Sequence, residues 1–257
     1  MALPLKSILS GRPLAVALAV SAALVWTTLS GDVMHGLGGL AAQVPYGRSV
    51  LASLSDVLVM VALAALAAGR SPLAILGLAG LSGPVRRPLL WAVIWIAPAV
   101  AICLIWARLA PDLKAADIAW LSIGGPFAEE LVYRGLAVGV LMRVCGWRGP
   151  AACLWPALFF GLVHVWQGSD PGTIAGVVAI TALGGLLFGW LFIRWNFNLW
   201  PPVLLHVGLN LLWQVFNLGD NAIGGWVGNA ERIVAVMAAI AATFWLAPRD
   251  PAVPGGD

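Results

Sequence analysis

Apolar residues run along most of this chain in long stretches that polar residues interrupt at nearly regular intervals. A stretch of about 17 to 25 mainly apolar residues has the length of a membrane-spanning helix. The sequence predicts eight such spans, near residues 13–30, 51–69, 88–107, 119–142, 150–167, 173–193, 200–218 and 230–247. The expected fold class is therefore all-α, a polytopic membrane bundle of about eight transmembrane helices.

Composition strengthens this prediction and gives it an orientation. Of 257 residues, 61% are hydrophobic and 10% are charged, whereas about a quarter of a soluble domain is charged. Cytoplasmic loops of membrane proteins are enriched in Lys and Arg. If the N-terminus lies in the cytoplasm and the chain crosses the membrane an even number of times, nine cations fall on the cytoplasmic side: Lys6, Arg12, Arg70, Arg86, Arg87, Arg143, Arg148, Arg194 and Arg249. It puts four outside, Arg48, Arg108, Lys114 and Arg232. We therefore expect a multi-pass protein of the cell membrane with both termini in the cytoplasm.

The beginning of the chain has an alternative interpretation. Lys6 and Arg12 precede an apolar run, as in a cleavable signal peptide, but no small-x-small cleavage site follows Leu29. We interpret the first span as a signal-anchor helix.

Three regions are expected in one membrane domain. Residues 1–112 would form an N-terminal region of about three helices with a cytoplasmic connector, and residues 113–218 the core that carries the chemistry. Residues 219–257 would supply the last transmembrane helix and a disordered tail from Pro248 to Asp257.

Charge and cysteine content exclude several functions. The formal charge of +3 is explained by the loop cations, so we expect no nucleic-acid partner. Cys103, Cys145 and Cys153 show no CxxC spacing, so we predict neither a disulfide nor a thiolate metal site. They are interpreted as small packing residues.

The pair Glu129-Glu130, followed by Arg134, lies within the predicted fourth span, where charge is costly unless it has partners and a task. Glu130 and Arg134 stand at i and i+4 on one helix face and are expected to form an ion pair. Glu129 is turned by about 100 degrees, so it faces another neighbour. The alternative is that all three charges form a buried staple between helices.

Two further spans carry polar side chains. His164 is expected about 14 residues into the fifth span, which is roughly 20 Å along its axis. Glu129 is expected at a similar depth on a neighbouring antiparallel helix, so the two can meet. His206 and Asn210 share one face of the seventh span. The alternative interpretation is that His164, His206 and Asn210 only form hydrogen bonds between helices, as such residues often do. His35 is interpreted as an ordinary surface residue.

Together these motifs resemble the CPBP family of intramembrane proteases, which includes the type II CAAX prenyl endopeptidases and bacterial Abi proteins. The ordered motifs are Glu129-Glu130-x-x-x-Arg134, Phe160-x-x-x-His164 and His206-x-x-x-Asn210. The resemblance covers about residues 117–218, and three motifs in order are far more specific than one. Tyr133 stands where a Phe is expected. The first hundred residues carry no family signature.

The resemblance implies a glutamate-dependent endopeptidase acting on a membrane-associated protein or peptide. Glu129 would activate water, and His164 would position it and help to protonate the leaving amine. His206 and Asn210 would stabilise the oxyanion, while Glu130 with Arg134 would orient Glu129.

A metal-dependent mechanism remains an alternative. Glu129, His164 and His206 could hold zinc with one open position. The HExxH pattern is absent from the sequence, and we favour catalysis without a cofactor.

Two functions of other classes also stay open. A proton- or ion-coupled transporter could use intramembrane Glu and His as a relay, and Asp56 in the second span favours it. No internal hydropathy repeat supports that reading. The other alternative is a non-catalytic membrane chaperone or immunity factor. The substrate, beyond a membrane-proximal peptide bond, is not specified by the sequence.

Overall fold

The computed structural model describes residues 12–37 and 39–247, and in these ranges every regular element is a helix. The tail predicted from Pro248 and most of the segment ahead of the first span lie outside the described residues. The long helices are α2 (Arg12–Thr27), α4 (Gly47–Ala68), α6 (Arg86–Trp106), α10 (Gly149–Leu162), α11 (Pro171–Arg194), α12 (Trp200–Phe216) and α13 (Trp226–Leu246). Shorter helices are α3 (Ser30–Leu37), α5 (Pro72–Leu76), α7 (Ala115–Asp117), α8 (Gly125–Glu130) and α9 (Gly139–Arg143). The predicted all-α class is confirmed.

Among the described residues, fewer helices than predicted have the length and composition of a membrane span. Four described helices, α4, α6, α11 and α13, are long and apolar enough to cross a membrane. A fifth is possible if α2 and the start of α3, which meet at a 49° bend, form one span. At the predicted fifth and seventh spans, α10 has 14 residues and α12 has 17. The expected count of about eight is therefore not confirmed, although a helix is present at every predicted position.

The helical path from α7 to α9 contains two π-helical segments, Ile118–Gly124 and Leu131–Val138, on either side of α8. At the end of the first segment, the Gly125 N–H bonds the Trp120 carbonyl, five residues back. The next carbonyl, Leu121 O, would need the N–H of Pro126, which has none. π-helical turns are rare and occur often at functional sites.

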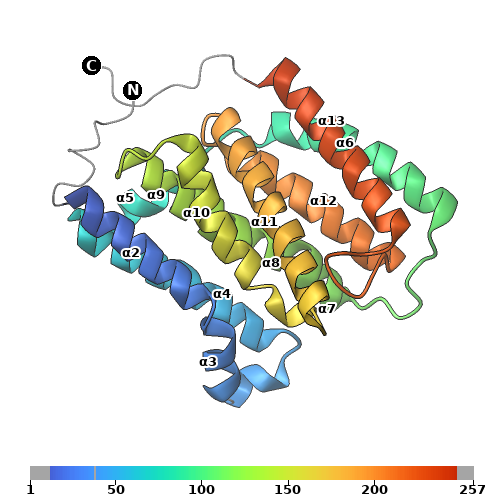
Figure 1. The fold of residues 1–257 in the computed structure, drawn as a ribbon, viewed down its shortest axis with the longest axis horizontal. Coiled ribbons are helices and arrows are strands. Elements are labelled where there is room, and N and C mark those ends of the chain that lie inside the picture. The colour runs from blue at the N-terminus through green and yellow to red at the C-terminus, as the bar shows by residue number, and fades with distance from the viewer. Residues whose placement is uncertain (1–11, 38, 248–257) are drawn as a thin grey trace.

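Figure 1 shows how the helices are arranged: α2 and α4 lie at one end of the molecule, and α6 and α13 at the other. The helices α8, α10, α11 and α12 lie between them. Small residues let α10 and α11 approach closely, because a Cβ on Gly185 or Gly189 would meet Ala157 or Cys153 at 2.9 Å. The helix α10, which carries Phe160, is therefore packed closely against α11.

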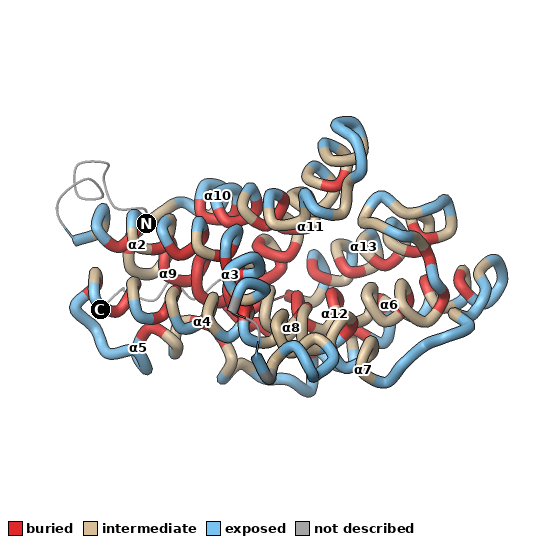
Figure 2. The backbone as a smooth tube through the Cα atoms, turned by 90° about the horizontal axis from the view of Figure 1, so that it is seen from below, coloured by how far each residue is buried: buried red, intermediate tan, exposed pale blue. Residues whose placement is uncertain are grey.

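Buried residues concentrate along the inward faces of the helices, and exposed ones on the outside (Figure 2). Much of the outer surface is apolar, with Leu58, Leu66 and Trp245 among the most exposed side chains. Contiguous exposed apolar surface of this kind marks contact with a membrane or a partner. Together with the apolar helices, it fits a membrane protein.

Candidate active site

Three elements bring the predicted residues to the middle of the molecule. The helix α8 ends with Glu129 and Glu130, α10 carries Phe160 and is followed by His164, and α12 carries His206 and Asn210. The site lies between the two apolar cores of the protein, because Phe160 belongs to one core and Phe188 to the other.

The predicted ion pair between Glu130 and Arg134 is present. Arg134 Nη1 lies 3.1 Å from Glu130 Oε1, and both residues are buried. The guanidinium group also lies over two aromatic rings, with its carbon 4.3 Å from the centre of Phe160 and 5.3 Å from that of Phe188. Neither Nη atom makes a regular hydrogen bond within the described chain. Arg134 is thus held by one carboxylate and by cation–π contacts.

His206 connects the two glutamates. Its Nδ1 lies 2.8 Å from Glu130 Oε1, and its Nε2 lies 3.8 Å from Glu129 Oε2. The imidazole ring stacks on Phe188, with 5.0 Å between ring centres. The sequence motifs predicted a partner for Glu130 on its own helix but did not predict this second one, because contacts between helices leave no regular spacing.

The two neighbouring carboxylates differ in their access to solvent. The Glu130 side chain is 0% exposed, whereas that of Glu129 is 34% exposed. Glu129 is therefore the carboxylate that a substrate or a water molecule can reach. The two adjacent carboxylates therefore have different surroundings, and their separate roles stay a prediction.

His164 lies differently from the prediction. The α10 helix ends at Leu162, so His164 sits in the turn after the helix and not within a longer span. Its Nδ1 lies 2.6 Å from the Phe160 carbonyl, one of the last carbonyls of α10, and its ring packs edge-on against Phe160. Because a carbonyl can only accept, Nδ1 carries the hydrogen, and in the neutral ring Nε2 is left as an acceptor. No hydrogen bond or ion pair joins His164 to Glu129 among the described residues.

Asn210 connects α12 to the π-helical segment ahead of α8. Its Nδ2 donates to Leu121 O at 3.0 Å, the carbonyl that Pro126 cannot serve. The Ser122 hydroxyl in turn donates to the main-chain carbonyl of Asn210 at 3.3 Å. One amide N–H of Asn210 is thus engaged, and an amide group has a second to offer. Ser122 carried no signal in the sequence, since a lone Ser in an apolar helix is common.

Phe160 and Tyr133 support the site from one side. Phe160 contacts the rings of Tyr133, His164 and His206 as well as the Arg134 guanidinium. The hydroxyl of Tyr133, which stands where a Phe was expected, donates to Thr27 Oγ1 of α2 at 2.9 Å. This residue therefore ties the site to the N-terminal region.

The residues considered for a zinc site do not form a ligand cluster. Across residues 12–37 and 39–247, no three His, Cys, Asp or Glu side chains converge as a metal site requires. Glu129 and His206 are neighbours, but His206 Nδ1 is already occupied by Glu130.

Comparison with known proteins finds a family similarity in the central part of the chain. Residues 111–212 match the family model described as "Type II CAAX prenyl endopeptidase Rce1-like". The matched range contains all three motifs, and the resemblance inferred from them is confirmed. No curated protein matches the chain, and no solved structure does.

Proposed function

Because residues 111–212 form an Rce1-like domain of the type II CAAX prenyl endopeptidase family, we propose that this membrane protein hydrolyses peptide bonds with Glu129 as the general base. The observation that carries the proposal is the difference between the two glutamates. Glu130 is buried and held by Arg134 and His206, whereas Glu129 is accessible.

Glu129 would take a proton from the attacking water. Its Oε2 and the Nε2 of His206 are 3.8 Å apart, a separation that a bridging water can span. The water oxygen would add to the carbonyl carbon of the substrate, and the Glu129 carboxylate would accept its proton. As the C–N bond breaks, Glu129 would return this proton to the leaving nitrogen, with help from His164, so that a neutral amine departs.

His206 is suited to stabilise the negative charge on the substrate oxygen. In the protonated ring both nitrogens donate; Nδ1 donates to Glu130, and the Nε2–H is free for the oxyanion. The buried Glu130 carboxylate, 2.8 Å from Nδ1, would stabilise the positive charge of such a ring and fix its orientation, and Arg134 Nη1 lies 3.1 Å from the same carboxylate oxygen. The second N–H of Asn210 would complete the oxyanion hole.

His164 would hold the water before attack. The bond from Nδ1 to the Phe160 carbonyl leaves Nε2 as an acceptor for one water hydrogen. This tautomer is required for the role, because a ring with hydrogen on both nitrogens could only donate.

Localisation and substrate are part of the proposal. We propose a multi-pass protein of the cell membrane with both termini in the cytoplasm, as the charge bias predicts. The substrate would be a membrane-associated protein or peptide cut close to the bilayer.

The test uses the full chain in liposomes with two probes, a fluorogenic farnesylated CAAX peptide and a library of single-span peptides. Cleavage is expected for the natural protein and is expected to fall by at least about a thousandfold in Glu129→Gln, which keeps the shape of the side chain but cannot act as a base. Circular dichroism and a melting curve check that the variant folds. Full activity of Glu129→Gln would refute the proposed base.

The proposed mechanism uses no metal, and metal content can be measured directly. Elemental analysis of the active protein and activity after chelation are compared on one preparation. Stoichiometric zinc whose removal abolishes cleavage would overturn the metal-free route. Transport of a labelled ion by the same liposomes, without cleavage of either probe, would favour the transporter alternative.

A further inference from the structure

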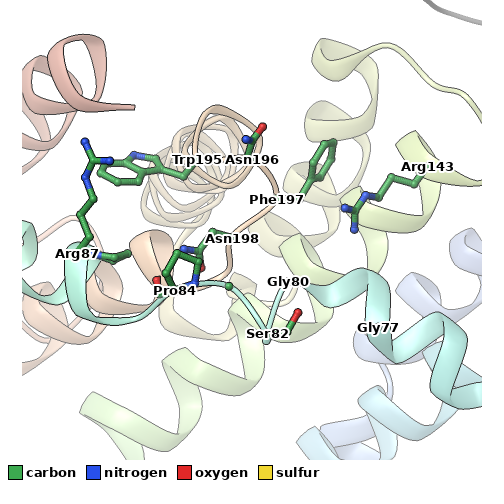
Figure 3. Close-up of a pocket in the computed structure, with 12 residues that line it drawn as sticks. Gly77, Gly80, Ser82, Pro84, Arg87, Arg143, Trp195, Asn196, Phe197 and Asn198 are labelled. Atoms are coloured by element: carbon green, nitrogen blue, oxygen red, sulfur yellow. The ribbon is translucent and has the colours of Figure 1, made fainter. Parts of the chain in front are cut away.

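A cavity of about 310 Å³ lies away from the candidate active site, at the opposite end of α12 from Asn210. It forms where the connector between α5 and α6 meets the turn between α11 and α12. Figure 3 shows Arg87 and Arg143 on opposite sides of it, with Pro84 and Asn198 between them. None of the functions discussed so far uses this cavity.

The walls of the cavity are fixed by a strained turn. Phe197 adopts φ 56°, a left-handed conformation that is unusual for a bulky residue. The connector holds the turn in place, because Leu199 N donates to Gly80 O at 3.2 Å and Asn198 Nδ2 donates to Pro84 O at 2.9 Å. The fit is close, since a Cβ on Gly80 would lie 2.0 Å from Phe197 O. Strain held by the surrounding structure is typical of functional sites.

The charged side chains that line the cavity are all positive. Two arginines line it and no carboxylate does. Arg143 Nη1 donates to Leu78 O at 3.2 Å and its guanidinium lies over Phe197, while Arg87 Nη2 donates to Leu246 O at 2.8 Å. Neither arginine forms an ion pair with any residue in 12–37 or 39–247. Each guanidinium group has five N–H donors, so most of them remain available to an anion.

We propose that this cavity binds a phosphate group carried by the headgroup of an anionic phospholipid. Arginine is the side chain best matched to phosphate oxygens. In the orientation proposed from the charge bias, Arg87 and Arg143 would lie at the cytoplasmic surface, and basic pockets between helices on that side bind lipid headgroups. Directly after Arg87, the exposed side chains of Leu89 and Leu90 on α6 offer an apolar surface for acyl chains.

The sharpest test adds a charge instead of removing a contact. Ser82 is exposed and lines the cavity, and its side chain makes no hydrogen bond within residues 12–37 and 39–247. Ser82→Asp places a carboxylate in the cavity, and Ser82→Asn has nearly the same size without the charge. Arg87→Gln tests the contact itself, with the exposed Arg148→Gln as its control.

The full chain is reconstituted in nanodiscs of phosphatidylcholine with phosphatidylglycerol, and retained lipids are counted by native mass spectrometry. We expect the natural protein, Ser82→Asn and Arg148→Gln to retain phosphatidylglycerol in preference to phosphatidylcholine. Ser82→Asp and Arg87→Gln should weaken this retention by about tenfold, the effect of losing about 1.4 kcal/mol. Equal retention by Ser82→Asp and Ser82→Asn would overturn the proposal.

Inorganic phosphate added to the protein in detergent separates the two sources of this chemistry. A rise in Tm that Ser82→Asp abolishes, without preferential retention of phosphatidylglycerol, would support the phosphate site but assign it to a soluble anion. If neither phosphate nor phosphatidylglycerol binds, the site is refuted.

Discussion

Two regions of the molecule bury a glutamate, and they treat it in different ways. Between α8 and α12, Glu130 has Arg134 at 3.1 Å and His206 at 2.8 Å. Between α13 and α6, Glu231 is equally buried, yet neither of its oxygens has a hydrogen-bond partner within the described chain. The adjacent Arg232 lies over the ring of Trp213 instead.

The difference shows at which of the two glutamates the surrounding residues can stabilise a buried negative charge. An ionised carboxylate out of water costs several kcal/mol unless charges or hydrogen bonds compensate it. For Glu130 the compensation comes from two helices, and it connects the pair to the accessible Glu129. Within residues 12–37 and 39–247, Glu231 has no hydrogen bond or ion pair of this kind. Removing a partner of Glu130 should therefore be costly, whereas replacing the Glu231 carboxylate with a neutral group should cost little.

The largest effect is expected for Arg134→Ala. This change leaves Glu130 buried without its cation, and breaking such a pair typically costs about 3–5 kcal/mol. It also removes the cation–π contacts to Phe160 and Phe188. We expect a large fall in the free energy of unfolding, measured by denaturant titration in detergent, together with loss of peptide cleavage.

Two variants sharpen this result. Arg134→Lys keeps the charge but loses the planar group, so an intermediate stability is expected. Arg148→Ala removes an exposed arginine and should change little. A stable and fully active Arg134→Ala protein would contradict the role of the ion pair.

Much of the fold was predictable because membrane helices follow from local composition. The eight apolar stretches all contain helices, but the sequence could not show that α10 ends at Leu162. An apolar run continues through Leu162 and Val163 in the sequence, so hydropathy alone extends the helix past His164. The π-helical segments around α8 were missed for a similar reason, since they change the hydrogen-bond register without changing composition.

The candidate site was predictable as a set of residues and less so as a set of contacts. The pairing of Glu130 with Arg134 follows from i,i+4 spacing within one helix. The contact from His206 to Glu130 depends on how α12 packs against α8, and that information is spread over many apolar side chains. The contact from Asn210 to Leu121 O was also beyond the sequence, because Pro126 leaves Leu121 O without a donor only in the π-helical register.

A smaller effect is expected for Asn210→Ala, which tests whether the first region depends on more than its charges. The change leaves Leu121 O without the N–H that now lies at 3.0 Å, and because this bond is only part-buried, we expect a cost near the lower end of the range for an unsatisfied group, about 1 kcal/mol. Stability is measured by the same denaturant titration. Gln214→Ala, one turn further along α12, is the matched control. Equal stabilities of the two variants would show that the bond to the π-helical segment contributes nothing.

The smallest effect is expected for Glu231→Gln, the direct test of the second region. The amide has the shape of the carboxylate, and no ion pair or hydrogen bond within residues 12–37 and 39–247 is lost. Because an amide is less costly to bury than a carboxylate, we expect no loss of stability and a gain of up to about 1 kcal/mol. Peptide cleavage should be unchanged.

The matched variant Glu130→Gln makes the same chemical change in the first region, where Arg134 and His206 would lose their anion. If Glu231→Gln destabilised the protein as much as Glu130→Gln, Glu231 would have to be charged and partnered, and the contrast between the two regions would not hold.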